Sequence, residues 1–388
     1  MRLAKIPTGW DAAAQRAWVE GDRPGAIAAS VAALNGRPTA AHALQLGYYL
    51  FRVGDFAATA GVLERALGDY PGNLDLLLNI IVAHAKARQR ERAAHYAEEY
   101  IRLGGTNPMG FAALCDAFAV AGDAVRAKHY GEKTLAIKDA QACGQPARQL
   151  HPTPGAAGKR KIISFSLWGD HPRYLRGALH NALLAPLLYP GWTCRFTVEP
   201  STDISLLDAL REAGAEVRVD HRTDLPNRLC RRFLVSDDPD VGHFLSRDCD
   251  SVISERESLA VAEWIASGKR FHVMRDWWAH GDLILAGMWG GTAGALPPMA
   301  ELLASYRPGV METAHWDQWF LRDSVWPMIR DDVLVHDRFF DLFGARRFPG
   351  EVPAGKRHVG ENEYAARPAP QAAFLRPWAE RVPSLQLL

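Results

Sequence analysis

Residues 161–169 read KIISFSLWG, a short apolar run that ends in Trp-Gly and is typical of a buried strand. Apolar residues recur at helical spacing over 174–188. The stretch 192–200 (WTCRFTVEP) is a second strand by its composition, 204–214 (ISLLDALREAG) an amphipathic helix closed by glycine, and 215–222 (AEVRVDHR) a third strand. Strands that alternate with helices predict a parallel sheet with helical crossovers, a Rossmann-like α/β arrangement.

A fourth predicted strand, VGHFLSRDCD at 241–250, carries two aspartates at its end. In an extended chain Asp248 and Asp250 point to one face and Cys249 to the other. Two neighbouring carboxylates repel each other unless a cation is close by, and oxygen ligands favour Mg²⁺ or Mn²⁺ over zinc. Ligands of open α/β sheets gather at the carboxyl ends of strands, so the pair predicts a divalent metal beside substrate phosphates. An exposed polar turn explains the same residues without a ligand.

The first 140 residues repeat. Four segments align on Gly21, Gly54, Arg88 and Gly122, which are 33, 34 and 34 residues apart. At fixed offsets after these anchors lie alanines (Ala26, Ala93 and Ala127; Ala33 and Ala66) and prolines (Pro38 and Pro71). This pattern predicts two antiparallel helices per unit. The anchor ends the first helix, small alanines let the helices approach, and proline stops the second.

These repeats resemble the tetratricopeptide repeat (TPR) over roughly residues 8–140. The resemblance implies a curved solenoid that binds an acceptor or partner protein, or holds subunits of a homo-oligomer together. The stretch 141–160 is rich in proline, glycine and alanine and is typical of a domain boundary. We therefore predict a TPR-like domain at 1–145, a linker at 146–160 and an α/β domain at 161–388.

Composition excludes several classes of function. The formal net charge of +1 gives no electrostatic case for a nucleic-acid or membrane partner. The five cysteines form no CxxC pair, which argues against a zinc knuckle and is typical of reduced thiols in a cytoplasm. No apolar run approaches the length of a membrane span, and the first residues lack the apolar core of a signal peptide. We expect a cytoplasmic protein.

Residues 160–360 resemble glycosyltransferases of the GT-A fold, in which a DxD motif closes a central strand. The resemblance is carried by SFSLWG, FLSRDCDS, RDWWAHGDLILAGMWGG, HWDQWFL and KRHVG. It implies that the end of the first strand holds the base and ribose of a nucleotide-sugar donor. It also implies a metal site. The implied residues are Ser166, Leu167 and Trp168 for the nucleoside, Asp248 for ribose and metal, and Asp250 and His358 for metal.

Further candidates come from the chemistry of sugars and phosphates. Arg247 adjoins the acidic pair. Arg275 is suited to a donor phosphate and Asp276 to sugar hydroxyls. Tryptophan offers a flat apolar face to a sugar ring, so Trp289 is a candidate, and Gly290 with its glycine neighbour is expected in a loop that shapes the sugar site. Asp317 and Asp276 are the predicted catalytic carboxylates. Asp317 is either a base on the acceptor hydroxyl or a group that steadies the donor. Core packing, or helix N-terminal charge for Asp317, explains the same residues.

The sequence therefore predicts a metal-dependent glycosyltransferase whose acceptor is a saccharide or a protein. It leaves two alternatives open. One is a TPR adaptor with a degenerate nucleotide-sugar-binding domain and no activity. The other is a nucleotidyltransferase, although no glycine- and lysine-rich loop follows the first strand. A dinucleotide-binding GxGxxG is absent from the same position. The nucleobase, the sugar, the acceptor and the stereochemical outcome are not encoded in any recognisable motif.

Overall fold

The computed structural model describes residues 7–144, 149–152, 155–156, 158–221, 228–307 and 315–387. The chain divides into two compact units after Ala140. Part of the predicted linker, residues 146–148, 153–154 and 157, lies outside the described residues. Among the helices that are described, none combines the length and apolar character needed to cross a bilayer.

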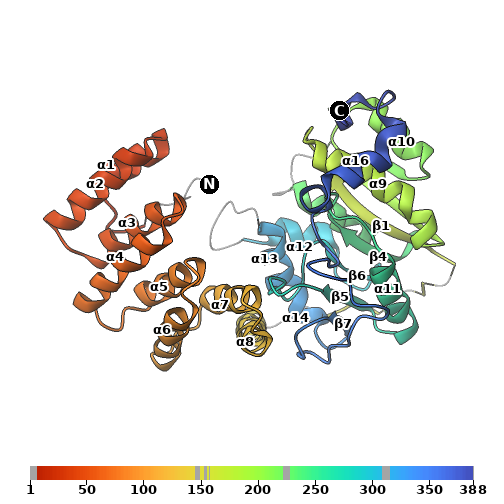
Figure 1. Ribbon diagram of the computed structural model, residues 1–388. Helices are drawn as coiled ribbons and strands as arrows, with labels where there is room; N and C mark the ends of the chain where they lie inside the picture. Colours follow the sequence, from red (N-terminus) through yellow and green to blue (C-terminus); the bar gives the residue numbers. More distant parts are fainter. Residues whose placement is uncertain are drawn as a thin grey trace. The chain divides into compact units, whose positions relative to one another are not determined.

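The described part of the N-terminal unit is built from helices (Figure 1). They are α1 (Ala12–Glu20), α2 (Arg23–Gly36), α3 (Ala40–Arg52), α4 (Phe56–Asp69), α5 (Leu74–Lys86), α6 (Arg90–Arg102), α7 (Met109–Val120) and α8 (Ala124–Ala142). Consecutive helices pair as the repeat predicts. The alanines at the matched positions of three repeats, Ala26, Ala93 and Ala127, are fully buried between helices. Pro38 and Pro71 follow the ends of α2 and α4. The prediction of paired helices with a period of 33–34 residues is confirmed.

All four anchor residues adopt the left-handed backbone conformation that closes a helix. Their φ angles are +93° at Gly21, +87° at Gly54, +62° at Arg88 and +81° at Gly122. Glycine adopts this conformation without steric cost, and arginine does not. The third repeat therefore keeps the turn geometry of its neighbours with an unfavourable residue, because the packing of α5 against α6 imposes it.

The C-terminal unit combines a sheet with helices. Its elements are β1 (Arg160–Leu167), α9 (Pro172–Leu188), β2 (Trp192–Val198), α10 (Ile204–Glu212), β3 (Glu216–Val219), the 3-10 helix η1 (Arg228–Asp237), β4 (Val241–Arg247), α11 (Glu255–Ser267), β5 (Phe271–Arg275), β6 (Met288–Thr292), α12 (Met299–Ser305), α13 (Trp316–Phe320), the π-helical turn η2 (Leu321–Val325), α14 (Trp326–Ile329), β7 (Val333–Asp337), α15 (Glu363–Ala366), α16 (Pro368–Leu375) and the 3-10 turns η3 (Arg376–Trp378) and η4 (Pro383–Leu385).

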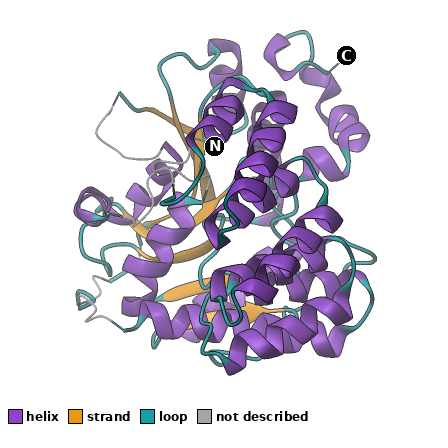
Figure 2. Cartoon of the chain, turned by 90° about the vertical axis from the view of Figure 1, so that its left-hand side faces the viewer, coloured by secondary structure: helices purple, strands orange, loops and turns teal. Residues whose placement is uncertain are grey.

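The seven described strands, orange in Figure 2, form one mixed sheet in the order β3-β2-β1-β4-β6-β5-β7. β1 pairs in parallel with β2 and β4, and β2 pairs in parallel with β3. The predicted parallel arrangement of these four strands is confirmed. β6 runs antiparallel to both β4 and β5. The predicted α/β class is confirmed in this form, as a mixed sheet.

The sequence predicts a loop at the segment MWGG, and this prediction is wrong. Residues 288–292 form the fully buried strand β6. Glycine is required there for close strand approach. A Cβ on Gly290 would lie 2.4 Å from the carbonyl oxygen of Phe244, and one on Gly291 would lie 2.7 Å from the Phe271 ring. A glycine run in a strand can mark such close approach instead of flexibility.

The hydrophobic core of this unit joins its first strands to the C-terminal segment. Phe165 of β1 and Phe196 of β2 stack at 4.8 Å beneath α9 and α10, and Leu375, Val382 and Leu385 of the C-terminal segment belong to the same buried cluster. The C-terminal segment is thus part of the core, and it also supplies residues near the acidic pair of β4.

The strand order places a topological switch point between β1 and β4. From β1 the chain moves outward to β2 and β3, and it then returns to β4 on the other side of β1. At such a point the connections leave the sheet in opposite directions and open a crevice at the carboxyl ends of the two strands. Ligands of open α/β sheets bind in this crevice.

Candidate functional site

The acidic pair follows β4 at this switch point. The Asp248 side chain is 44% exposed and that of Asp250 is 19% exposed, whereas Cys249 between them is buried in the core. The Cys249 thiol faces the carbonyl oxygen of Ser166 in β1, 3.4 Å away. The predicted alternation requires an extended chain, but β4 ends at Arg247 and residues 249–250 form a turn, so only the contrast between a buried Cys249 and two partly exposed aspartates is present.

Arg232 connects the acidic pair to two other parts of the unit. It lies in η1, and only 2% of its side chain is exposed. Its guanidinium donates to Asp248 and, at 3.0 Å, to Oδ2 of Asp317 in α13. Its backbone N–H donates to the hydroxyl of Ser166 at 2.9 Å. One buried cation therefore holds the ends of β1 and β4 and the start of α13 in a fixed arrangement.

Asp250 has a separate set of partners. The Arg173 guanidinium of α9 lies 3.5 Å from Oδ2, and the Asn362 amide donates to the same oxygen at 3.1 Å. The backbone N–H of Glu363 donates to the Asp250 carbonyl at 3.0 Å. Residues from α9 and from the C-terminal segment thus meet at the second aspartate.

The charges of this cluster are not balanced. Three carboxylates, Asp248, Asp250 and Asp317, face two guanidiniums, Arg173 and Arg232. Burial raises the pKa of Asp250. Repulsion from Asp248 raises this pKa further, and attraction to Arg173 opposes the increase. Burial likewise raises the pKa of Asp317, with Arg232 opposing and Asp248 adding. Oxygen donors with excess negative charge are the kind of ligand that a hard divalent cation prefers.

Two glycines allow the backbone and side chains to approach the acidic pair closely. A Cβ on Gly177 of α9 would lie 1.8 Å from the carbonyl oxygen of Cys249. A Cβ on Gly287 would lie 2.0 Å from Oδ2 of Asp248. The positions of both aspartates therefore depend on the absence of two side chains.

The switch point also carries a small pocket, which we call the edge pocket. It is lined by Ser166, Leu167, Trp168, Tyr174, Leu229, Arg232, Asp248 and Cys249. The rings of Trp168 and Tyr174 stack at 6.2 Å on one side of it. Its volume is ≈ 20 Å³, room for about one water molecule, so it admits only a small group of a larger ligand. The structure brings four predicted site residues together here: Ser166, Leu167, Trp168 and Asp248.

Other predicted site residues lie in the interior. Arg275 pairs with Asp337 at 2.7 Å, and Arg247 lies 3.4 Å from Glu257. Asp276 accepts from the backbone N–H of Val359 at 2.9 Å and from Arg256. All three are buried, with their charges compensated inside the protein. The arrangement corrects the expectation that Arg275 and Arg247 face a donor and that Asp276 faces a sugar.

Trp289 and Gly290 also lie in the interior, within the buried strand β6. The indole of Trp289 is buried between Phe233 and Phe244, whose ring centroids lie 5.7 Å and 5.2 Å from its own. Gly290 pairs with Leu245 and His272 inside the sheet. These two residues contribute to packing, in correction of their predicted contact with the sugar.

The contacts of His358 involve other residues than those that bind Asp248 and Asp250. Its ring stacks on Trp277 at 4.9 Å, and its Nδ1 is 2.8 Å from the Lys356 carbonyl oxygen. Among the described residues, no group of three or more His, Cys, Asp or Glu side chains converges as metal ligands would. The structure therefore does not bring His358 together with Asp248 and Asp250, and the predicted three-ligand set is not formed.

Sequence reasoning missed Arg232, Arg173 and Asn362 as members of the site. Arg231 and Arg232 are adjacent and chemically identical, yet Arg231 pairs with Asp220 at 3.1 Å while Arg232 reaches Asp248 and Asp317. Only the fold distinguishes them. Asn362 follows Asp250 by 112 residues, and no local pattern links the two.

No protein-family model matches this chain, and no curated protein matches it. Among solved structures, the chain is similar to MamA at 20% identity and a TM-score of 0.30, covering 32% of this chain and 74% of MamA. It is also similar to a mutant O-GlcNAc transferase of Thermobaculum terrenum at 19% identity and a TM-score of 0.35, covering 61% of this chain and 44% of the transferase. Both scores are too low to carry an argument about the activity of this chain.

Proposed function

We propose that the C-terminal unit transfers a sugar from a nucleotide-sugar donor to an acceptor hydroxyl, with a divalent ion at Asp248 and Asp250. One observation carries the proposal. The acidic pair closes the central strand β4 at the topological switch point, beside the end of β1, where ligands of open α/β sheets bind. A DxD motif at the end of a central strand is also the feature on which the resemblance to GT-A glycosyltransferases rests.

Each part of the site has a defined task in this reaction. The end of β1 receives the nucleoside, with one group of it in the edge pocket. Asp248 and Asp250 would hold Mn²⁺ or Mg²⁺, which when bound neutralises charge on the departing diphosphate. Arg232 orients Asp248 through their hydrogen bond and keeps Asp317 beside it. The side chains of Arg232, Asp248 and Asp317 are thus in contact before any substrate binds. Such preorganisation lowers the barrier to reaction.

The transfer exchanges one bond at the anomeric carbon for another. The acceptor oxygen forms a bond to the anomeric carbon, and the bond from that carbon to the diphosphate oxygen breaks. The electron pair leaves with the nucleoside diphosphate. The hydroxyl proton passes to a carboxylate or to water. Asp317 is the candidate carboxylate, because burial raises its pKa toward values suited to accepting a proton. Whether it acts as base or steadies the donor depends on the stereochemical course.

The helical repeats of the N-terminal unit are proposed to recruit the acceptor or a partner protein, or to join subunits. Stacked helix pairs form extended surfaces of the kind used for protein recognition.

A second function is favoured by the contacts of the aspartates themselves. Arg232, Arg173 and Asn362 already engage both carboxylates through protein contacts. A cluster satisfied in this way is also compatible with a domain that binds a nucleotide sugar without turnover, attached to an adaptor of helical repeats.

Nucleotide release separates the two functions. The purified chain is incubated with a panel of nucleotide sugars, with and without Mn²⁺, and the nucleoside diphosphate is quantified. In parallel, thermal unfolding is measured with each nucleoside diphosphate and Mn²⁺. We expect release with at least one donor, dependent on Mn²⁺, and abolished in Asp250→Asn. The exposed Asp208 of α10 provides a matched control, because Asp208→Asn makes the same chemical change at a carboxylate that pairs with Arg211 and not with the acidic cluster.

Two outcomes decide against the proposal. Binding of a nucleoside diphosphate with no release from any donor indicates the non-catalytic function. Release at an equal rate in wild type and Asp250→Asn removes the acidic pair from the reaction.

A further inference from the structure

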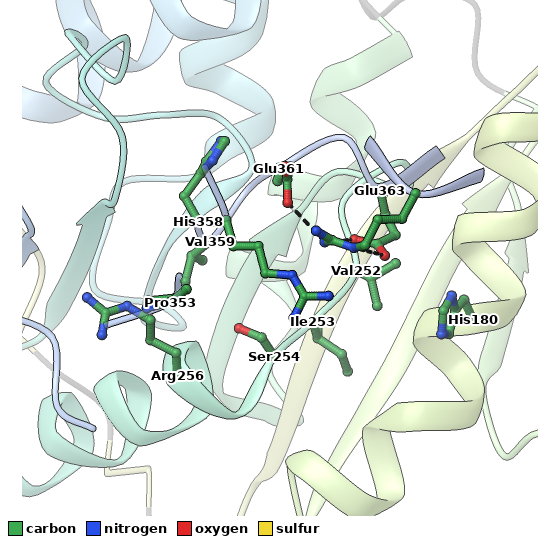
Figure 3. A pocket seen from close by; sticks show the side chains of 12 residues that line it. His180, Val252, Ile253, Ser254, Arg256, Pro353, His358, Val359, Glu361 and Glu363 are labelled. Carbon is green, nitrogen blue, oxygen red and sulfur yellow. Dashed lines mark hydrogen bonds and ion pairs between the residues drawn. The ribbon is translucent and has the colours of Figure 1, made fainter. Parts of the chain in front are cut away.

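A larger pocket lies beside residues 252–254, which follow the acidic pair, and we call it the side pocket. Its volume is ≈ 300 Å³. It is bounded by α9, by residues 252–254 after the acidic pair, by the start of α11 and by residues from 353 to 367 (Figure 3). This volume is at the lower end of the range of small-molecule sites, roughly 300–1,000 Å³. None of the functions assigned above uses it.

The pocket contains a buried polar group without a partner. His180 of α9 lines it, is 9% exposed, and has no hydrogen-bond partner at Nδ1 among the described residues. Its ring packs on Phe374 at 4.3 Å, which holds the imidazole in place. Buried polar atoms are nearly always paired, so an exception calls for a reason, and a ligand is one. Burial lowers the pKa of His180, so the ring is neutral at pH 7 and suited to a hydroxyl.

The wall of the side pocket is continuous with the acidic site. The side chains of Glu361 and Glu363 face the side pocket, as Figure 3 shows, and Asn362 between them reaches Asp250 at 3.1 Å. Arg367 fixes both glutamates, at 2.9 Å from Glu361 and 2.7 Å from Glu363. Asn362 is therefore the residue that connects the wall of the side pocket to Asp250.

One cation of the side pocket, Arg357, has no ion-pair partner among the described residues. Arg256 is paired with Asp276 at 3.3 Å, and Arg367 with the two glutamates. Arg357 also lines the pocket, is exposed, and forms no ion pair within the part of the chain that the structure describes. An anionic group is thus attracted to the Arg357 side of the pocket.

The remaining lining suits a sugar ring. Val252, Pro353 and Val359 offer apolar surface, while Ser254, His180 and the two glutamates offer groups that exchange hydrogen bonds with hydroxyls. A pyranose has apolar faces and a rim of hydroxyls, and its size is compatible with this volume.

We propose that the side pocket is the acceptor subsite and that it binds a saccharide carrying a carboxylate or a phosphate group. The word acceptor rests on the proposed function, whereas binding of an acidic saccharide does not. The anionic group lies toward Arg357, and the hydroxyls lie toward His180 and the Glu361–Glu363 wall.

The test measures binding by ligand-observed NMR with three probes at equal concentration: glucuronic acid, glucose 6-phosphate and glucose. Arg357→Glu is compared with Lys356→Glu. Both changes reverse one exposed positive charge in the same segment, but only Arg357 lines the side pocket. We expect an acidic probe to bind at least about tenfold more tightly than glucose. We expect Arg357→Glu to abolish that preference and Lys356→Glu to retain it; a tenfold change corresponds to about 1.4 kcal/mol. The two acidic probes distinguish a uronic acid from a sugar phosphate.

A second measurement separates failure of this inference from failure of the proposed function. Stabilisation by a nucleoside diphosphate with Mn²⁺ depends on the acidic pair and is expected to be unchanged in Arg357→Glu. If that stabilisation is present but no acidic probe binds, or if Arg357→Glu binds probes as wild type does, the side-pocket inference is overturned alone. Competition between an acidic probe and the nucleoside diphosphate also overturns it, because the pocket then belongs to the donor. Loss of nucleotide binding in the wild type counts against the proposed function instead.

Discussion

Replacing Gly177 by alanine tests whether the contact between α9 and the backbone at Cys249, between the two aspartates, positions the site. A Cβ at this position would lie 1.8 Å from the carbonyl oxygen of Cys249, and real Cβ contacts are essentially never shorter than 3.0 Å. Helix or loop must therefore move by at least 1.2 Å, the difference between 3.0 Å and 1.8 Å. Both sides of the contact are backbone, so no side chain can rotate away.

The expected cost follows from overpacking. Adding a methyl group to a well-packed interior costs about 1–3 kcal/mol, and contact with backbone places this site toward the upper end. The control is Gly61→Ala in α4, where an added Cβ meets no atom within 4 Å. Alanine is favoured over glycine inside a helix by about 0.5–1 kcal/mol, so the control is expected to be stabilised. The two variants are thus predicted to differ in sign.

Two assays are needed. Urea unfolding followed by tryptophan fluorescence reports mainly the stability of the C-terminal unit, which holds ten of the twelve tryptophans, and circular dichroism, which records all helices, adds the helical repeats. Thermal stabilisation by a nucleoside diphosphate with Mn²⁺ reports the acidic pair, and we expect Gly177→Ala to reduce it even at temperatures where the variant is folded. Misplacement of reacting groups by about 1 Å can cost about a hundredfold in rate. Wild-type stability together with wild-type nucleotide binding in Gly177→Ala would refute the reasoning.

Single contacts and one raised pKa give three more predictions. Arg88→Gly is expected to stabilise the repeats by about 0.5–1 kcal/mol in urea, because Arg88 holds a φ of +62° that glycine adopts without cost, and a loss of stability would contradict this. Arg232→Met leaves Asp248 and Asp317 without their shared cation, and we expect the free energy of unfolding to decrease by about 3 kcal/mol. In a double-mutant cycle, Asp317→Asn is expected to restore part of this loss, and strictly additive effects of the two changes would argue against coupling. Burial raises the pKa of Asp250, so the protonated form favours the folded state, and this contribution is lost as pH rises through the raised pKa. Binding of Mn²⁺ with a nucleoside diphosphate has the opposite dependence. As the pH decreases, this binding is expected to be lost with a midpoint above pH 3.8, the ordinary pKa of an aspartate. A midpoint at or below 3.8 would count against a raised pKa.

Much of the fold is predictable because it depends on local pattern. The strand-helix alternation after residue 160 and the 33–34-residue repeat before it reflect the periods of side chains along strands and helices. The burial of Cys249 between two partly exposed aspartates agrees with the same two-residue period, although residues 249–250 form a turn and not an extended strand. The exception is β6, whose glycines predict a loop by their local pattern. They are there because Phe244 and Phe271 approach the strand closely, a requirement that no neighbouring residue in the sequence reveals.

The candidate site is predictable only in part. The acidic pair and the end of β1 are correctly predicted as neighbours, since parallel strands end at one edge. Arg275, Asp276 and Trp289 have the chemistry expected of a sugar site. In the structure, however, Arg275 pairs with Asp337, Asp276 pairs with Arg256, and Trp289 packs in the aromatic core. Residue type alone does not show whether a charge is compensated inside the protein or left for a ligand.

The amino-acid sequence by itself determined two architectures, an array of helix pairs and a parallel α/β core, and it placed two carboxylates directly after the end of a strand. These properties arise from backbone periodicity within short segments. Only the tertiary structure decided which cations meet those carboxylates and where a larger pocket forms beside them. Arg232, Arg173 and Asn362 come from segments that are distant in sequence and converge only after the sheet is assembled, because electrostatic and hydrogen-bond partners are selected by distance in space.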